Sequence, residues 1–296
     1  RNAFVSLPAF GGLITLIDFP EMAEQEMTQA IKFEAHKYIP TSLDEVVISW
    51  EVVERNFSKM ALKNNEDKKI EKSDAILKVL LVAASRDKIL KYEDMIKTAG
   101  LKLKSIDIEA FSAVRSLVGN DLGCFIIVDI GSSACNIILV ERGIIRINRN
   151  IDAGGADLTK TISKAMAIDS ERAEALKVSG KNFFAPESAI SFATLELITG
   201  EVERIIRAYF RDGENKAINE IILSGGSANL VGLADYFSDK LKIKTVIGNS
   251  FARIGYDSKL EKSVSKIRAG FSVAVGLALK GVDEYLKKEV EKTVKK

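Results

Sequence analysis

The residues best suited to chemistry stand in a short turn between two apolar runs, in "IIVDIGSSACNIILV". Asp129 ends the first run, and Gly131, Ser132 and Ser133 follow it. Glycine has no Cβ, so the backbone can turn tightly and approach a ligand. Successive N–H groups in such a turn can hold phosphate oxygens. We therefore predict a phosphate here, with Asp129 facing Mg²⁺ through water, because magnesium gives up its waters reluctantly. A hairpin without a ligand is the alternative.

A second glycine turn lies in "IILSGGSANLVGL". Gly225 and Gly226 follow a β-branched strand, and we expect a helix to begin near Ser227. A helix N-terminus at the carboxyl end of a strand is a natural ligand site. Gly154 and Gly155 open another predicted helix. None of these turns matches the P-loop or the dinucleotide-binding pattern, so P-loop and nicotinamide enzymes are poorly supported.

Other chemistries find little support in the composition. The two cysteines, Cys124 and Cys135, lack a Cys-x-x-Cys spacing, and His36 is the sole histidine, which argues against zinc. No "GxSxG" elbow surrounds the serines, so a hydrolase triad is not expected. The net charge of +2 gives no argument for nucleic-acid binding. No apolar run approaches the ~18 residues of a membrane span.

The first part of the chain is predicted to form a compact α+β unit. Alternation and helical periodicity predict strands at residues 3–8, 12–20, 44–55, 75–85 and 101–108, with helices at 21–39, 87–100 and 109–119. Residues 56–74 are polar and without a period, which predicts a mobile surface loop or a hairpin excursion.

The second part carries both turns. We expect Asp169 or Ser170 to cap a helix, a long helix at 186–213, a last strand at 244–251 and a small-residue helix at 264–281. The predicted domains are residues 1–119, containing an α+β subdomain at about 14–105, residues 120–281, and a charged helical tail at 282–296.

This order of elements resembles the actin-like ATPases, the group of actin, Hsp70, sugar kinases and FtsA. "IIVDIGSSACNIILV" is similar to their second phosphate motif and "IILSGGSANLVGL" to their adenosine motif. The resemblance implies an FtsA-like α/β fold with two domains around a nucleotide cleft and an α+β subdomain inserted in domain one. "DSERAEALK" is similar to the helix whose Glu174 and Lys177 would approach the ribose and base.

The first part narrows the resemblance to the PilM family of type IV pilus assembly proteins, through "AIKFEAHKYIP" followed by "LDEVV". This resemblance implies ATP or ADP with Mg²⁺ as cofactors and at most slow ATP hydrolysis. It implies a cytoplasmic protein at the inner face of the cytoplasmic membrane. Its partners would be the N-terminal peptide of a PilN-type membrane protein and other pilus platform proteins, with no nucleic acid.

The chain departs from this family in one respect. A first phosphate motif, another strand–DxG–strand hairpin, is expected near the N-terminus, and nothing before Phe4 supplies it. We expect that hairpin upstream, in a longer protein. The remaining alternatives are an FtsA-like cell-division protein, a nucleotide-free interaction platform, a small-molecule kinase of the same fold, and a role in type II secretion.

Overall fold

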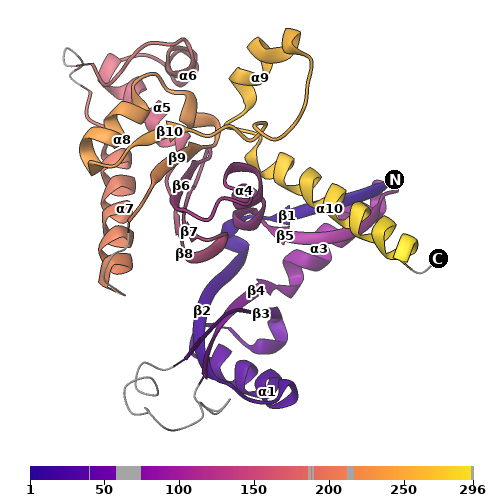
Figure 1. Cartoon of the computed structure of the whole chain (residues 1–296). Coiled ribbons are helices and arrows are strands. Elements are labelled where there is room, and N and C mark those ends of the chain that lie inside the picture. Colours follow the sequence, from indigo (N-terminus) through magenta and orange to yellow (C-terminus); the bar gives the residue numbers. More distant parts are fainter. Residues whose placement is uncertain (40, 58–74, 186–187, 189, 212–216, 295–296) are drawn as a thin grey trace. The chain divides into compact units, whose positions relative to one another are not determined.

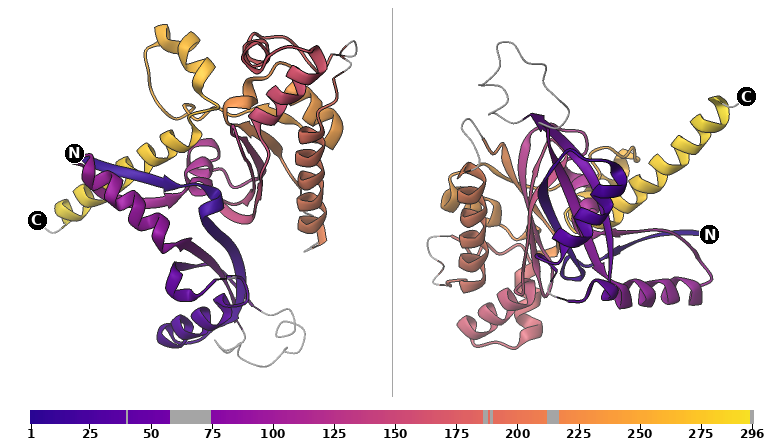
Figure 2. Two further views of the ribbon diagram at one scale, coloured as in Figure 1. Left: turned by 180° about the vertical axis from the view of Figure 1, so that it is seen from behind. Right: turned by 90° about the horizontal axis from the view of Figure 1, so that it is seen from below.

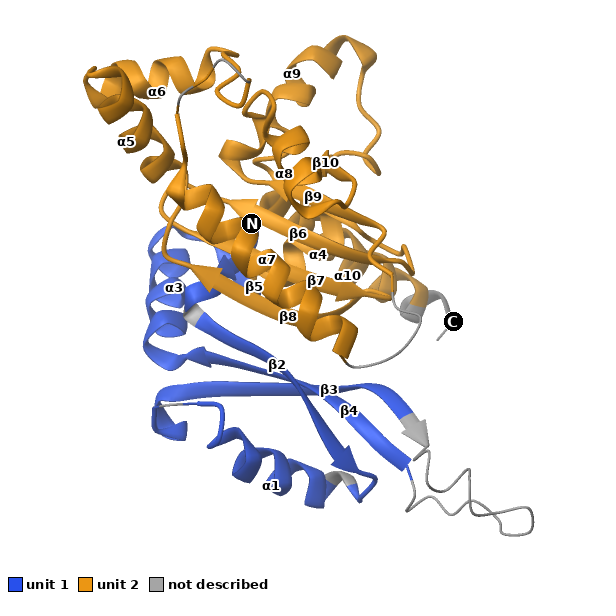
Figure 3. Ribbon diagram, turned by 90° about the vertical axis from the view of Figure 1, so that its left-hand side faces the viewer, with its two compact units in different colours: residues 1–106 blue, residues 107–296 orange. Residues whose placement is uncertain are grey.

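The computed structural model describes residues 1–39, 41–57, 75–185, 188, 190–211 and 217–294 (Figure 1). The chain divides into two compact units, residues 1–106 and residues 107–296 (Figure 3). This division places the helix after residue 108 in the second unit, whereas the domain boundary expected from the sequence follows that helix. Most of the loop expected at 56–74 lies outside the described residues. Within the described residues, no helix is long and apolar enough to span a bilayer.

The described residues of unit 1 (residues 1–106) form two small sheets and two α-helices. The three-stranded sheet is antiparallel with the order β2-β4-β3, and the two-stranded sheet has the order β1-β5. The elements are β1 (Asn2–Leu7), β2 (Gly12–Pro20), α1 (Glu24–Ala35), β3 (Val46–Phe57), β4 (Ala75–Ser85), α3 (Arg86–Thr98) and β5 (Lys102–Ile108), which continues two residues into unit 2.

The core of unit 1 forms where α1 covers one face of the three-stranded sheet. Alternate residues of β4, such as Val79 and Leu81, point to that face because side chains alternate along a strand. Met27 and Ile31 of α1, four residues apart and so on one helix face, are buried against them. The observed helix α1 is shorter than the helix predicted at 21–39, because it ends at Ala35.

Unit 2 (residues 107–296) is built on a five-stranded sheet of order β10-β9-β6-β7-β8, in which β6 is parallel to β9 and antiparallel to β7. Its elements are α4 (Glu109–Leu117), β6 (Cys124–Ile130), β7 (Cys135–Glu141), β8 (Ile144–Ile151), α5 (Gly155–Met166), α6 (Ser170–Val178), α7 (Ala193–Arg211), β9 (Glu220–Ser224), α8 (Leu233–Leu241), β10 (Thr245–Ile247), α9 (Glu261–Ile267) and α10 (Ser272–Val294).

Helices cover both faces of this sheet (Figure 3). Ile126, Val128 and Ile130 of β6 belong to the largest core cluster, together with the apolar face of α7. The intervening residues, Ile127 and Asp129, point to the opposite face, the side on which α4 packs against β7. The strand therefore reads as a continuous apolar run until Asp129, as expected for a strand that is buried on both faces.

Three helix boundaries in unit 2 differ from those predicted. The α-helix expected near Ser227 was wrong: residues Gly226–Asn229 form a single 3₁₀ turn, and α8 starts only after Gly232, which has a φ of +83°. The small-residue helix is two helices, α9 and α10, separated around Gly270 (Figure 2). Helix α7 begins at Ala193, and residues 186–187 and 189 lie outside the described set.

Candidate functional site

The two glycine turns are neighbours because they follow adjacent parallel strands. Asp129, at the end of β6, is in register with Ser224, at the end of β9. The carboxyl ends of parallel strands lie at the same edge of a sheet, so the turn at 131–134 and the turn at 225–226 share that edge. We call them the first turn and the second turn.

The first turn is tied to the start of helix α5. Its own N–H at Gly131 donates to the carbonyl of Ala134 at 2.9 Å. Its carbonyls accept from α5: Gly155 N–H donates to Gly131 O and Ala156 N–H to Ser132 O, both at 2.8 Å. Within the described chain, the N–H groups of Ser132 and Ser133 donate to no protein atom. These two donors are available for an anion.

Gly154 and Gly155 allow α5 to approach the turns this closely. A Cβ on Gly154 would lie 2.7 Å from the carbonyl oxygens of both Gly131 and Ser132. A Cβ on Gly155 would lie 2.6 Å from the Ser227 hydroxyl oxygen. Gly154 has an extended φ of −161°, which any residue adopts, so the reason for glycine here is space. The predicted glycine pair therefore joins both turns to one helix.

The second turn needs glycine for a different reason. Gly225 has a φ of +86°, in the region that L-residues avoid. A Cβ there would also lie 2.6 Å from the carbonyl carbon of Ile130 and 2.7 Å from Oδ1 of Asp129. The neighbouring Gly226 has open space where a Cβ would be. Asp129 thus lies beside the second turn as well as the first.

Lys177 of α6 braces α5 against α6. Its ammonium donates to the carbonyl of Gly155 at 3.0 Å and to Thr159 Oγ1 at 2.8 Å, and it pairs with Glu174 Oε2 at 2.6 Å. Its side chain is only 8% exposed. Lysine has three donors, and all three are occupied by these contacts. Lys177 can therefore contribute charge and position to a ligand without a direct hydrogen bond.

Glu174 presents a carboxylate to solvent on the same helix. Partial burial alone would raise its pKa, but hydrogen bonds from Lys177 and Thr159 and the charge of Lys177 outweigh that effect and lower its pKa. The Thr159 hydroxyl bonds to the same oxygen, Oε2. The other carboxylate oxygen is left to accept hydrogen bonds, for which hydroxyl groups are suitable donors.

Asp129 is partly buried, and no lysine or arginine of the described residues pairs with its carboxylate. Burial raises its pKa to about 6, with a partly compensating hydrogen bond from Ser224. Asn136 of β7 is in register with Asp129, and its buried Oδ1 has no hydrogen-bond partner. A carboxylate beside an unpartnered amide oxygen suits a hard cation or its waters.

The described residues contain no group of three or more metal-ligating side chains. Mg²⁺ bound here would therefore take most of its ligands from water and phosphate, which is its usual behaviour. The residues fit Mg²⁺ as the companion of a phosphorylated ligand, rather than as a cation bound by the protein alone.

A cavity of about 680 Å³ opens where the two turns, α5 and α6 meet. A second cavity of about 510 Å³ shares Lys177, Val178, Gly226 and Ser227 with it and extends toward Ser265 and Lys266. The first cavity is lined by these of the predicted site residues: Gly131, Ser132, Gly155, Glu174, Lys177, Gly226 and Ser227. Its lining does not include Asp129, Ser133, Gly154 or Gly225, although each lies in or next to a turn that does line it.

Sequence reasoning did not find several lining residues. Thr159 lies one helical turn beyond Gly155, a spacing that places both on one face of α5 and could have identified it. Lys160, Ser170 and Glu171 also line the first cavity, and Asn136 lies beside Asp129. Asn136 could have been inferred only by pairing β6 with β7 across the turn. Of the two predicted capping residues, Asp169 or Ser170, it is Asp169 that caps α6, accepting from the Arg172 N–H at 2.8 Å.

This arrangement, a sheet with two glycine turns at one edge and helices on both faces, defines an α/β protein with the actin-like ATPase fold. The family model of the type IV pilus assembly protein PilM matches residues 2–282. The chain therefore belongs to the PilM family of type IV pilus assembly proteins, and the family expected from the sequence is confirmed.

The chain is also similar to solved structures. A PilM-PilN type IV pilus biogenesis complex matches 95% of this chain and 80% of its own chain, with a TM-score of 0.74 and 24% identity. MreB5 of Spiroplasma citri bound to ADP matches at a TM-score of 0.49 and 16% identity, covering 70% of this chain and 68% of its own. The ethanolamine utilization protein EutJ from Carboxydothermus hydrogenoformans matches at a TM-score of 0.43 and 22% identity, covering 62% of this chain and 57% of its own.

Proposed function

We propose that this protein binds ATP or ADP with Mg²⁺ at the two glycine turns and serves as a nucleotide-dependent switch in pilus assembly. The observation that carries this proposal is the cavity between residues 131–132 and 226–227, which is lined by Ser132, with its free N–H donor, and by the braced Lys177, and which has a second cavity beside it. Asp129 lies just before the first turn that lines this cavity. Binding and switching, rather than rapid turnover, is the proposed activity.

Each group has a distinct role in this proposal. The N–H groups of Ser132 and Ser133 contact the phosphates, and Asp129 holds a water of the phosphate-bound Mg²⁺. Glu174 accepts from the ribose hydroxyls through its free oxygen. The second cavity, which extends from Lys177 to Lys266, holds the base. Mg²⁺ supplies charge neutralisation to the phosphates, and the protein supplies position.

The partner proposal rests on family membership. We place the protein at the inner face of the cytoplasmic membrane through a PilN-type membrane protein, whose N-terminal peptide it binds, alongside other platform proteins. One solved structure to which the chain is similar is a PilM-PilN complex. Nucleotide state would then shift the population of the conformation that binds the peptide.

Titration with a fluorescent ATP analogue in the presence of Mg²⁺ tests the nucleotide proposal. Wild type is expected to bind, and Lys177→Met to bind about tenfold or more weakly, because α5 and α6 lose their brace and the cavity loses a charge. Lys262→Met, an exposed residue of α9 outside both cavities, is the matched control and should bind like wild type. Absence of wild-type binding, or equal binding by all three proteins, would contradict the nucleotide proposal.

Binding of a PilN-type N-terminal peptide tests the partner proposal separately. Peptide affinity should differ between the nucleotide-free and Mg-ATP states of wild type, and Asp129→Ala should abolish the difference. Peptide binding that ignores nucleotide would favour a nucleotide-free interaction platform. Steady phosphorylation of a sugar or acyl acceptor would favour a kinase.

A further inference from the structure

The chain passes from unit 1 to unit 2 once, because unit 1 is the continuous segment 1–106. That junction, the Ile106–Asp107 peptide, lies near the end of β5, and α4 begins two residues later, at Glu109. Asp107 is therefore the first residue of unit 2. What holds Asp107 determines how firmly the junction is fixed to unit 2.

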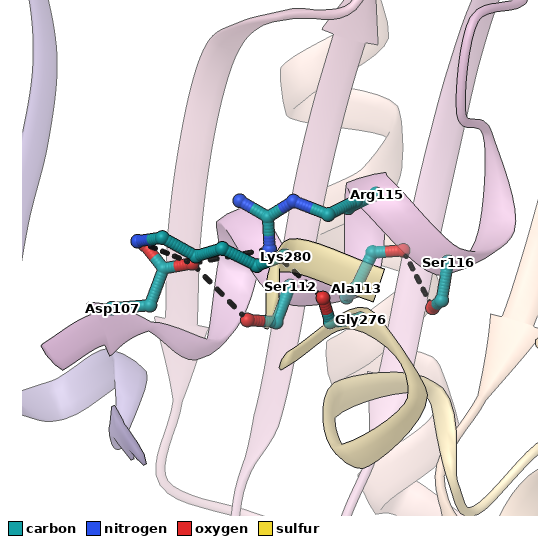
Figure 4. Close-up of polar contacts among 7 residues, drawn as sticks. All are labelled: Asp107, Ser112, Ala113, Arg115, Ser116, Gly276 and Lys280. Carbon is teal, nitrogen blue, oxygen red and sulfur yellow. Dashed lines mark hydrogen bonds and ion pairs between the residues drawn. The ribbon is translucent and has the colours of Figure 1, made fainter. Parts of the chain in front are cut away.

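One carboxylate oxygen of Asp107 is held by three side chains from two helices (Figure 4). Oδ2 accepts from the Ser112 hydroxyl at 3.4 Å and from Arg115 Nη1 at 3.2 Å, and it lies 3.6 Å from Lys280 Nζ. Ser112 and Arg115 belong to α4, and Lys280 belongs to α10. The Asp107 side chain is only 12% exposed, so solvent screens these contacts less than those of a surface pair.

The same cluster presses α10 against α4. Arg115 Nη1 also donates to the backbone carbonyl of Gly276 at 3.1 Å (Figure 4). A Cβ on Gly276 would lie 2.5 Å from the carbonyl carbon of Ser112 and 2.8 Å from its Cα. The two helices thus touch backbone to backbone, and no flexible side chain separates them at this crossing.

The N-terminal end of α10 is attached to the second turn and to the end of β9 before it. The hydroxyls of Ser272 and Ser224 are hydrogen-bonded at 2.8 Å, and both are buried. The N–H of Gly225 donates to Ala269 O at 2.9 Å, just before α10 begins. Ser272 and Lys280 are eight residues apart on one helix, a separation of about 12 Å.

We propose that α10 is a rigid relay that links the second turn to the junction of the two units, with Asp107 as its anchor at the junction. The first half of α10 is attached at both ends and in its middle. A displacement of the second turn therefore moves Gly276 and Lys280, and with them Asp107. This inference rests on the proposed function only for the ligand that would drive the displacement.

The relay is tested first without any ligand, by a double-mutant cycle in the full chain. Ser272→Ala removes the contact at the turn, and Asp107→Asn removes the anchor charge while keeping its shape. Hydrogen exchange is measured over residues 107–118 and 224–230. Sites this far apart normally act independently. A relay predicts that each variant raises exchange at the other end, and that the double variant differs from the product of the single effects by about threefold or more.

Asp283→Asn, an exposed acid on the same helix, is the matched control and should leave both segments unchanged. Lys280→Gln is a milder second variant, in case Asp107→Asn unfolds. It should show the same coupling at smaller amplitude. Additive effects within error, or effects confined to the mutated end, would overturn the relay.

Mg-ATP then separates the relay from the proposed function. In wild type, Mg-ATP is expected to slow hydrogen exchange at the two turns, residues 131–134 and 225–230, and also at the junction, residues 107–118. Asp107→Asn should keep the protection at the turns and lose the protection at the junction. Wild-type protection confined to the turns would overturn the relay and leave nucleotide binding intact. Absence of protection at the turns would contradict nucleotide binding, and the ligand-free cycle would still decide the relay.

Discussion

The first and second turns occupy the same edge of one sheet, yet glycine is required near each of them for a different reason. The first turn depends on glycines outside itself: Gly154 and Gly155 let α5 donate to its carbonyls. The second turn depends on its own Gly225, whose backbone is left-handed and touches the end of β6. The first is shaped by packing of a helix and the second by backbone conformation.

This difference separates stability from ligand binding in a testable way. Substitutions at the second turn should affect the fold first, because strain and collision combine at one residue. Substitutions at the first turn should mainly move α5, and so the donors that face the cavity. The predictions below run from the largest expected effect to the smallest.

Gly225→Ala should be the most damaging change. The φ of +86° and a Cβ within 2.7 Å of both Ile130 and Asp129 combine backbone strain with a collision against the neighbouring strand. The expected loss is about 3 to 5 kcal/mol of unfolding free energy, measured by urea denaturation. A loss as small as that of Gly226→Ala would contradict the assigned backbone conformation.

Gly154→Ala should cost less stability but disturb the site more selectively. The Cβ would meet two carbonyl oxygens of the first turn at 2.7 Å, with no positive φ to add strain. We expect a loss of about 1 to 3 kcal/mol, together with weaker Mg-nucleotide binding because α5 moves away from the turn. Unchanged nucleotide affinity in a folded variant would show that the attachment of α5 is only structural.

Asp129→Asn tests the charge between the turns. The pKa is raised from 3.8 to about 6, so the folded protein binds more protons between these values. Its stabilising contribution is present below pH 4 and is lost as the pH rises through 6. The variant should therefore be more stable than ligand-free wild type at pH 7.5, by about 3 kcal/mol, and equal to it near pH 4.

The same substitution should act oppositely on ligand binding, since Mg-ATP should stabilise wild type at pH 7.5 and the variant far less. Thermal unfolding with and without Mg-ATP measures both effects. A variant less stable than ligand-free wild type at pH 7.5 would show that the Asp129 charge is compensated in the folded state.

Gly226→Ala should have the smallest effect, and it serves as the control for Gly225→Ala. Its Cβ would occupy open space, so the stability should change by less than about 0.5 kcal/mol. Because Gly226 lines both cavities, the methyl group would meet only a bound ligand. A large loss of stability would show that both glycines of this turn are conformationally required.

Local sequence signals identified most of the elements that form the site. The apolar run ending in Asp129 predicted β6, Asp169 predicted the start of α6, and the glycine pair at 154–155 predicted the start of α5. These signals are local because caps, turns and strand patterns depend on residues within a few positions. The family, too, was recognisable from short motifs, and the family model confirms it.

Helix ends governed by packing were less predictable. The sequence "SGGSANL" has the composition of a helix start, but Gly232 delays α8 until Leu233. The segment 264–281 has the composition of one helix, but the chain turns between α9 and α10 so that Ala269 can accept from Gly225. That hydrogen bond joins residues 44 positions apart and leaves no local signal.

The sequence by itself determined the strand–turn–strand pattern, the capping residues and the family, because each depends on neighbouring residues. Only the tertiary structure decided that Lys177 spends its three donors on α5 and α6, that Asn136 stands beside Asp129, and that Asp107 is anchored to α10. The contacts of Lys177 with α5 and of Asp107 with α10 join different helices, and the register of Asn136 with Asp129 joins two strands, so each exists only once those elements have packed or paired.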